Sequence, residues 1–190
     1  RGASLNLEMA TDPGITRFAL KVRPDWVCIV PERRFEVTTE GGLDLKRGKK
    51  RLAETIIQLK KAKICVSLFV EPSLEAMRQA AEFGADAVEL HTGRYCLASQ
   101  GAFGARSRAM EKKELDRIAL AGLEAVKCGL AVHAGHGFDL SNVRPVAAMC
   151  RPGGEVLIEE FNIGHYLVCR AALVGLKGAV REMIAAVGAP

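Results

Sequence analysis

Long hydrophobic runs are missing from this chain of 190 residues. No apolar stretch approaches the roughly 20 residues that a membrane-spanning helix needs. The chain also lacks a basic start followed by an apolar segment, which is the pattern of a secretory signal. We therefore expect a cytoplasmic protein that does not bind membranes.

Aromatic residues are scarce, at 5% of the chain. The formal net charge of +5 would suit a nucleic-acid binder, because basic patches attract phosphate backbones. The basic residues are scattered, however, and only two or three adjoin, at residues 49–51 and 60–61. With neither clustered charge nor rings for base stacking, nucleic-acid binding is not expected. The positive charge instead favours small anionic ligands.

Cysteine pairs with metal-binding spacing are missing as well. The six cysteines include no Cys-x-x-Cys pair. Cys28 and Cys65 lie in apolar, strand-like runs, so we expect reduced and buried thiols. Low-complexity tracts and linker-like segments are also missing, and a single domain over residues 1–190 is expected.

What the sequence does contain is an alternation of short β-rich runs with helical patterns. The expected strands cover residues 5–9, 26–30, 64–70, 87–91, 130–133 and 156–161. The expected helices cover residues 13–22, 47–62, 73–84, 109–127, 140–149 and 166–187, the last broken near Gly175. Apolar strands separated by helices indicate a parallel sheet.

Regular β–α repetition leaves two architectures, a barrel or an open sheet. A closed eight-unit barrel typically needs about 250 residues, which is about two units more than this chain has. The chain also opens at Arg1 rather than at a methionine. We therefore expect a (βα)8 TIM barrel of which about six units are present, truncated at the N-terminus. A complete open sheet of six strands is the alternative.

Polar residues gather where the expected strands end. Glu8 ends the first strand, and Glu89 and His91 end the fourth. The fifth and sixth lead into His133-Ala134-Gly135-His136-Gly137 and Asn162-Ile163-Gly164-His165. In barrels and open α/β sheets alike, ligands bind at the carboxyl edge of the strands. The active site is therefore expected at this edge.

Glu8 is a candidate general base. Strand alternation puts Asn6 and Glu8 on one face, which would be the barrel interior. A carboxylate there is either paired or functional, and its pKa can be tuned for proton abstraction. Glu89 would be a second inward carboxylate, which makes a function for it more expected. For His91, a merely packed and hydrogen-bonded histidine stays open, as does the role of His133.

The glycine-rich strand ends indicate phosphate binding. Glycine lets backbone N–H groups approach a ligand, and an imidazole such as His136 can act as acid and base. The segment Gly164-His165 opens a helix, whose N-terminus attracts anions. Loops after the last two strands of barrels commonly bind phosphate. The alternative is that Gly137 and Gly164 serve only tight turns. No metal site is expected, because no carboxylate completes a ligand set around the two histidines.

The loop over residues 31–45 is long and charged and contains the pair Gly41-Gly42. Such a loop can close over a ligand and exclude water. Thr38 and Thr39 could donate hydroxyl groups to a phosphate. A plain surface loop is the alternative.

Seven segments together resemble the pyridoxine 5′-phosphate synthase family. They occur in the family's order across nearly all of the chain. They are Asn6-Leu7-Glu8-Met9-Ala10, Val30-Pro31-Glu32, Glu36-Val37-Thr38-Thr39-Glu40-Gly41-Gly42-Leu43-Asp44, Val66-Ser67-Leu68-Phe69, Glu89-Leu90-His91-Thr92-Gly93, Ala134-Gly135-His136-Gly137 and Asn162-Ile163-Gly164-His165.

The resemblance implies a transferase-type synthase that forms a homo-oligomer, an octamer, and needs no metal or organic cofactor. Its reaction condenses 1-deoxy-D-xylulose 5-phosphate with 3-amino-2-oxopropyl phosphate into pyridoxine 5′-phosphate, the ring-closing step of vitamin B6 synthesis. When the motifs are matched, Glu8 corresponds to the family's general base and His136 to its general acid. Glu89 corresponds to a carboxylate that stabilises a transition state. The positions that fall on substrate or phosphate contacts are Thr38, Gly137, Gly164 and His165.

The sequence departs from the family at its start. The family begins with two further βα units, which carry an Asn-x-Asp-His strand end, substrate-binding arginines and another catalytic histidine. Without them the resemblance implies a fragment or a chain that is inactive alone. Two further hypotheses about the function stay open. One is another TIM-barrel sugar-phosphate enzyme, an epimerase or a lyase, and the other is an inactive, truncated phosphate-binding subunit.

Overall fold

The computed structural model describes residues 2–31 and 41–188. In these residues a single parallel sheet has the strand order β1-β2-β3-β4-β5-β6, so each strand pairs with the next along the chain. The strands are β1 (Asn6–Met9), β2 (Trp26–Ile29), β3 (Cys65–Val70), β4 (Ala87–His91), β5 (Ala131–Gly135) and β6 (Glu160–Asn162).

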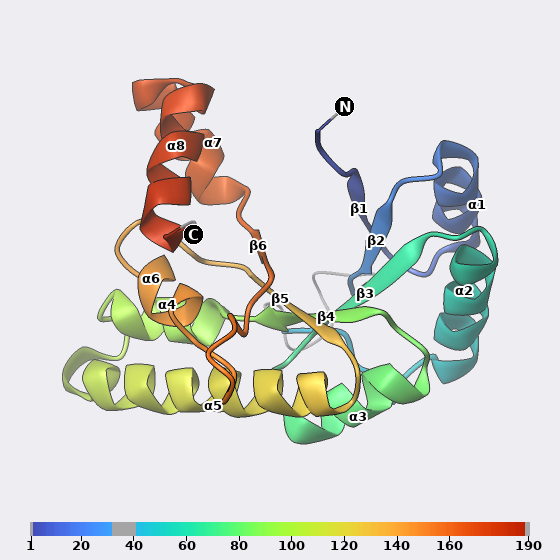
Figure 1. The fold of residues 1–190 in the computed structure, drawn as a ribbon, viewed down its shortest axis with the longest axis horizontal. Helices are drawn as coiled ribbons and strands as arrows, with labels where there is room; N and C mark the ends of the chain where they lie inside the picture. Colours follow the sequence, from blue (N-terminus) through green and yellow to red (C-terminus); the bar gives the residue numbers. More distant parts are fainter. Residues whose placement is uncertain (1, 32–40, 189–190) are drawn as a thin grey trace.

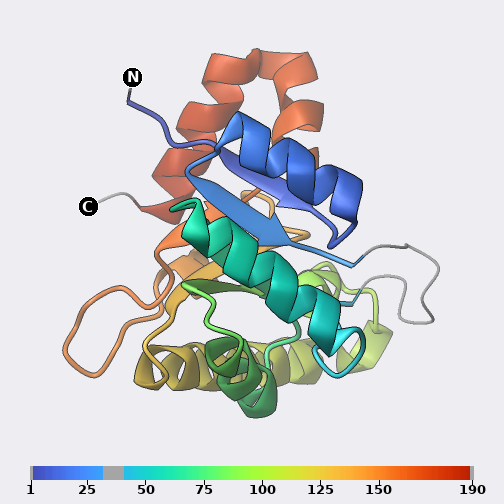
Figure 2. The same cartoon turned by 90° about the vertical axis from the view of Figure 1, so that its right-hand side faces the viewer.

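Helices connect the strands, and several of them cover the outer side of the sheet (Figures 1 and 2). They are α1 (Pro13–Val22), α2 (Lys49–Lys61), α3 (Leu74–Glu82), α4 (Gly93–Ser99), α5 (Ser107–Lys127), α6 (Val143–Ala147), α7 (His165–Val174) and α8 (Leu176–Val187), with a 3-10 turn at Gly104–Arg106. Figure 1 shows α7 and α8 as a hairpin at the β6 end, away from α1 and α2. No described helix is long and apolar enough to cross a bilayer.

The sheet is curved into the wall of a barrel. Five steps between flat, neighbouring strands would separate β1 from β6 by about 24 Å. Instead, Nδ2 of Asn6 on β1 donates to Oε1 of Glu160 on β6 at 3.2 Å. The rings of Trp26 on β2 and His133 on β5 also meet edge to face, at 5.2 Å between centroids. This closure of the interior excludes the flat open sheet, while β1 and β6 remain unpaired edges among the described residues.

The two faces of the wall differ in chemistry. Outward-facing strand residues pack against the helices and are fully buried, among them Val27, Val66, Leu68, Val88 and Val132. Burial of each such side chain contributes roughly 1.5–3 kcal/mol. The inward face is largely polar, and the strand register aligns its residues in rows, which include Glu8, Cys28 and Ser67, then Phe69, Glu89, His133 and Glu160.

Capping residues and glycines mark several helix ends close to the predicted bounds. Oδ1 of Asp12 accepts hydrogen bonds from two amides of the first turn of α1, and Ser73 caps α3 in the same way. Gly84 follows α3 with φ of 78°, a left-handed conformation that suits glycine. Gly175, with φ of 74°, separates α7 from α8.

The sixth strand differs from its prediction. Residues 156–161 were expected, but β6 covers Glu160–Asn162. Leu157 is buried, yet its amide bonds to the carbonyl of Met149 rather than to β5. An apolar run shows burial, and burial alone does not distinguish a strand from a packed loop.

Two helical predictions were also inexact. The segment expected to be a loop after the fourth strand contains the helix α4 (Gly93–Ser99). The helix expected over residues 140–149 is limited to α6 (Val143–Ala147). Both helices are short, and short elements carry too few periods for a pattern to be read.

Candidate active site

Glu89 lies at the centre of the polar inner face. Its side chain is only 4% exposed. Oε2 accepts a hydrogen bond from Nδ2 of Asn162 on β6 at 2.8 Å and another from the thiol of Cys28 on β2 at 3.3 Å. The carboxyl group of β4 is therefore held from both sides of the barrel interior.

The pKa of Glu89 is raised from 4.5 to about 7. Burial is the main cause, since a buried carboxylate loses its hydration. The charges of Glu8 and Glu160 raise the pKa further, while the hydrogen bonds from Cys28 and Asn162 work in the opposite direction. Near neutral pH this carboxyl group can therefore both give and take a proton.

Gly135 is required for this arrangement. A Cβ atom at position 135 would lie 2.0 Å from Oε1 of Glu89 and 3.0 Å from its Cδ. Any side chain there would displace the carboxyl group. The glycine before His136 therefore makes room for the neighbouring strand's carboxylate, which is a more specific role than the turn or ligand approach expected from the sequence.

His136 follows β5 directly and is exposed. Its φ of 75° is a left-handed conformation, which is uncommon for a residue other than glycine. The hydroxyl oxygen of Thr92 lies 2.7 Å from the carbonyl oxygen of Gly135 and 2.8 Å from that of His136, so its proton serves both. Thr92 thus holds the strained backbone that presents His136.

The ring of His136 lies next to two other rings, those of His91 and Phe69. Its centroid lies 4.8 Å from that of His91, with the planes at 65°, and 6.4 Å from that of Phe69. A Cβ atom at Gly93 would approach Cδ2 of His136 to 3.0 Å. Gly93 therefore leaves the space that the two imidazole rings occupy.

The predicted phosphate glycines follow two strands that pair with each other. Gly135 pairs with Asn162 in the β5–β6 ladder, so the loops that contain Gly137 and Gly164 leave the sheet together. Gly137 has φ of 92° and is exposed, and Gly164 is the residue before the first turn of α7. His165 is the first residue of α7 and is exposed. Helical N–H groups at this end are available to an anion.

Glu8 lies on the inner face as expected, but it is exposed. It pairs in register with Cys28, whose thiol contacts Glu89. The two predicted carboxylates therefore flank one cysteine. Thr38 lies outside the described residues, as does most of the predicted lid loop.

The two histidines whose roles were open differ from each other. His91 is buried, and its Nδ1 lies 2.7 Å from Oε1 of Glu71. His133 lies in the middle of β5 rather than at its end, and its pKa is lowered, mainly by burial. Glu160, with Oε1 3.9 Å from Nδ1 of His133, works against that shift.

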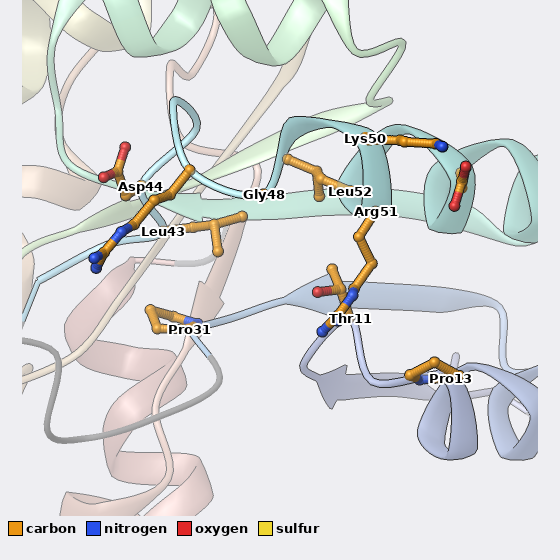
Figure 3. Close-up of a pocket in the computed structure, with 11 residues that line it drawn as sticks. Thr11, Pro13, Pro31, Leu43, Asp44, Gly48, Lys50, Arg51 and Leu52 are labelled. Carbon is orange, nitrogen blue, oxygen red and sulfur yellow. The ribbon is translucent and has the colours of Figure 1, made fainter.

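A separate open hollow of about 710 Å³ lies beside the carboxyl ends of β1 and β2. Figure 3 shows Arg51 reaching toward Thr11 across it, with Lys50 pointing away from Thr11. The hollow adjoins the start of α2, and none of the predicted catalytic residues lines it. Among the described residues, no cluster of histidine, cysteine and carboxylate side chains suits a metal ion.

Several contributors to the site were missed by the sequence analysis. Thr92, Cys28 and Asn162 support predicted residues, and Glu71 holds His91. Glu71 had a detectable signal, because it follows the third strand directly and is therefore another polar strand end. The partners of the other residues lie on different strands, and their contacts become visible only with the register.

The comparisons with known proteins identify the family of this chain. The family model described as "Pyridoxal phosphate biosynthesis protein PdxJ" matches residues 2–189. The chain belongs to the PdxJ family. The pyridoxine 5′-phosphate synthase of Syntrophotalea carbinolica is 48% identical over 184 residues, which cover 97% of this chain and 72% of that protein. The synthase of Caulobacter vibrioides (strain NA1000 / CB15N) is 45% identical over 183 residues, covering 96% and 68%.

A solved structure supports the fold. The chain is similar to a xylose isomerase domain protein from Planctomyces limnophilus, with a TM-score of 0.53 over 96% of this chain and 72% of that one. At 13% identity this likeness concerns the fold alone. Together with the curved, parallel wall, it confirms the TIM-barrel prediction, with six βα units among the described residues.

Proposed function

We propose that this protein is a pyridoxine 5′-phosphate synthase. The observation that carries the proposal is Glu89, a buried carboxyl group with a pKa of about 7, on the strand next to the one that leads into His136 and Gly137. Family membership and the names of the relatives support the same activity.

The substrates we propose are 1-deoxy-D-xylulose 5-phosphate and 3-amino-2-oxopropyl phosphate. Their condensation releases phosphate and water and forms pyridoxine 5′-phosphate. Two phosphorylated substrates suit a strand-end edge where Gly137 and Gly164 follow two paired strands and Gly164 precedes a helix. The proposed phosphate contacts are Thr38, Gly137, Gly164 and His165. The homo-oligomeric state remains a prediction from the family resemblance.

The proposed roles are those that the family resemblance implies for these residues. Glu8 acts as general base and His136 as general acid during imine formation, dehydration and ring closure. Glu89, which is partly protonated near neutral pH, stabilises charge that develops in the transition state. A lyase that forms a Schiff base would use a lysine on the inner face, and the six strands of the described residues contain none.

An assay with both substrates tests the proposal. We expect pyridoxine 5′-phosphate to form only when both are supplied, and we expect Glu8→Gln and His136→Asn to abolish turnover without unfolding the protein. Circular dichroism spectra would serve as the folding control. Product formation by both variants at near-normal rates would contradict the assigned roles, and no product from the unaltered protein would contradict the function.

A further inference from the structure

A chain of polar contacts runs behind His136. Glu71, directly after β3, places Oε1 2.7 Å from Nδ1 of His91 and Oε2 2.5 Å from Nη2 of Arg117 on α5. Nη1 of Arg117 lies 3.1 Å from Oε2 of Glu114, which also faces Arg94 at 3.5 Å. This series of polar contacts links α5, on the outside of the barrel, to His91, the histidine that contacts His136.

The charge of Glu71 fixes the direction of its hydrogen bond with His91. Burial acts to raise the pKa of Glu71, but the hydrogen bonds and positive charges of His91 and Arg117 outweigh it and lower the pKa to about 2. The carboxylate is therefore ionised and can only accept. Nδ1 of His91 must then carry a proton in either charge state of the ring, because an unprotonated Nδ1 would face the carboxylate with a lone pair.

The other nitrogen of His91 faces the predicted acid. His91 is 5% exposed, and its Nε2 is buried without a hydrogen-bond partner among the described residues. A Cβ atom at Gly93 would meet both Nε2 of His91, at 2.8 Å, and Cδ2 of His136, at 3.0 Å. Nε2 and the ring of His136 therefore border the same small space beside Gly93.

The ring of His91 has little freedom to leave this orientation. Phe69 meets it edge to face on one side, at 5.2 Å between centroids, and His136 does so at 4.8 Å. A flip of the ring would exchange the charge-assisted bond to Glu71 for a C–H contact. The amide of Gly42 also donates to Oε1 of Glu71, at 3.3 Å, and holds the carboxylate in place.

We propose that Glu71 is a positioning residue that acts through His91 to hold the ring of His136 for proton transfer. The inference rests on the proposed function, in which His136 is the general acid. A carboxylate that binds one nitrogen of an imidazole sets its tautomer and its orientation. Here the oriented imidazole is His91, and its ring supports that of His136.

The kinetic test uses Glu71→Gln, which keeps the shape of the side chain but removes its charge. We expect kcat to fall by about 10- to 100-fold with KM nearly unchanged, because loss of a supporting partner usually has this size. His91→Phe keeps the ring packing and removes both nitrogens. If Glu71 acts through His91, the double variant loses no more activity than the more impaired single variant.

A matched control comes from the same helix face as Arg117. Glu124 lies seven residues along α5 and pairs with Arg78, with Oε1 2.7 Å from Nε. Glu124→Gln removes an ion pair of similar geometry without touching His91, so kcat should not change. An equal loss of kcat in Glu124→Gln, or additive losses in the Glu71 and His91 variants, would overturn the proposal.

A second readout does not depend on the reaction. In protein labelled with 15N-histidine, the ring nitrogens of His91 should show a proton on Nδ1, and Glu71→Gln should shift the ring signals of both His91 and His136. Unchanged His136 signals would overturn the inference. If the unaltered protein forms no product, the proposed function fails, and these signals alone decide whether Glu71 positions His136.

Discussion

Glu89 on β4 and Glu8 on β1 lie at the same edge of the sheet, but the two carboxyl groups differ in their exposure to solvent. On β4, Glu89 is 4% exposed and receives hydrogen bonds from two other strands. On β1, Glu8 faces the same interior but is exposed. The sequence pattern treats the two residues alike, because each stands at an inward position near a strand end. Burial makes the difference, and it raises the pKa of Glu89 to about 7.

This difference in burial indicates which part of the site is preorganised before a substrate binds. The β4–β6 half fixes Glu89 and the backbone of His136 through buried contacts, which prearrange charge for catalysis. On the β1–β2 side, the neighbouring surface is an open hollow. Substitutions in the β4–β6 half should therefore change stability and activity together, whereas Glu8→Gln should change activity alone.

The largest effect is expected from Gly135→Ala. The added methyl group would lie 2.0 Å from Oε1 of Glu89, so the carboxyl group must move. We expect a loss of about 1–3 kcal/mol of unfolding free energy and loss of nearly all activity. Urea unfolding and the condensation assay measure the two effects. Gly153→Ala is the control, because a Cβ atom there meets nothing within 4 Å. Unaltered stability in Gly135→Ala would show that Glu89 is not confined.

Glu89→Gln should make the pH dependence of stability flatter. The pKa of Glu89 is higher in the folded protein than its ordinary value of 4.5, so the neutral form stabilises the fold below pH 4.5. This stabilisation is lost as the pH rises toward 7. Relative to Glu89→Gln, the unaltered protein should lose up to about 3 kcal/mol between these pH values. Parallel stability curves from pH 4 to 8 would contradict the raised pKa.

Thr92→Val should have a moderate effect. The substitution keeps the shape of the side chain but removes the hydroxyl group shared by the carbonyls of Gly135 and His136. We expect about 1–2 kcal/mol of destabilisation and a lower kcat, because the backbone that presents His136 loosens. Ser99→Ala, which removes a hydroxyl bond to the carbonyl of Cys96 within α4, should leave kcat unchanged. Equal effects of the two variants on kcat would contradict a role for Thr92 at His136.

The smallest effect is expected from Cys28→Ala. Its thiol hydrogen bond lowers the pKa of Glu89, so removing the bond should raise that pKa further. The change in stability should stay within about 1 kcal/mol. A titration of Glu89 followed by 13C NMR of its labelled carboxyl group would measure the shift. A lower pKa in this variant would mean that the thiol does not donate to Glu89.

The sequence predicts the fold better than it predicts the contacts of the site. Alternation and strand-end polarity place Glu8, Glu89 and His136 at one edge, because parallel strands bring their carboxyl ends together. The start of β6 could not be placed, since the buried Leu157 looks like a strand residue although it bonds to a loop. The contact between Cys28 and Glu89 spans 61 residues of sequence, and the curvature of the wall is what brings them together.

The central claim is that this protein joins two phosphorylated substrates into one phosphorylated ring. The most direct test is a 31P NMR time course of the purified protein with 1-deoxy-D-xylulose 5-phosphate and 3-amino-2-oxopropyl phosphate. Because two phosphates enter and the product keeps one, the proposed function predicts equal amounts of pyridoxine 5′-phosphate and inorganic phosphate. Conversion of one substrate without the other, or inorganic phosphate without pyridoxine 5′-phosphate, would contradict it.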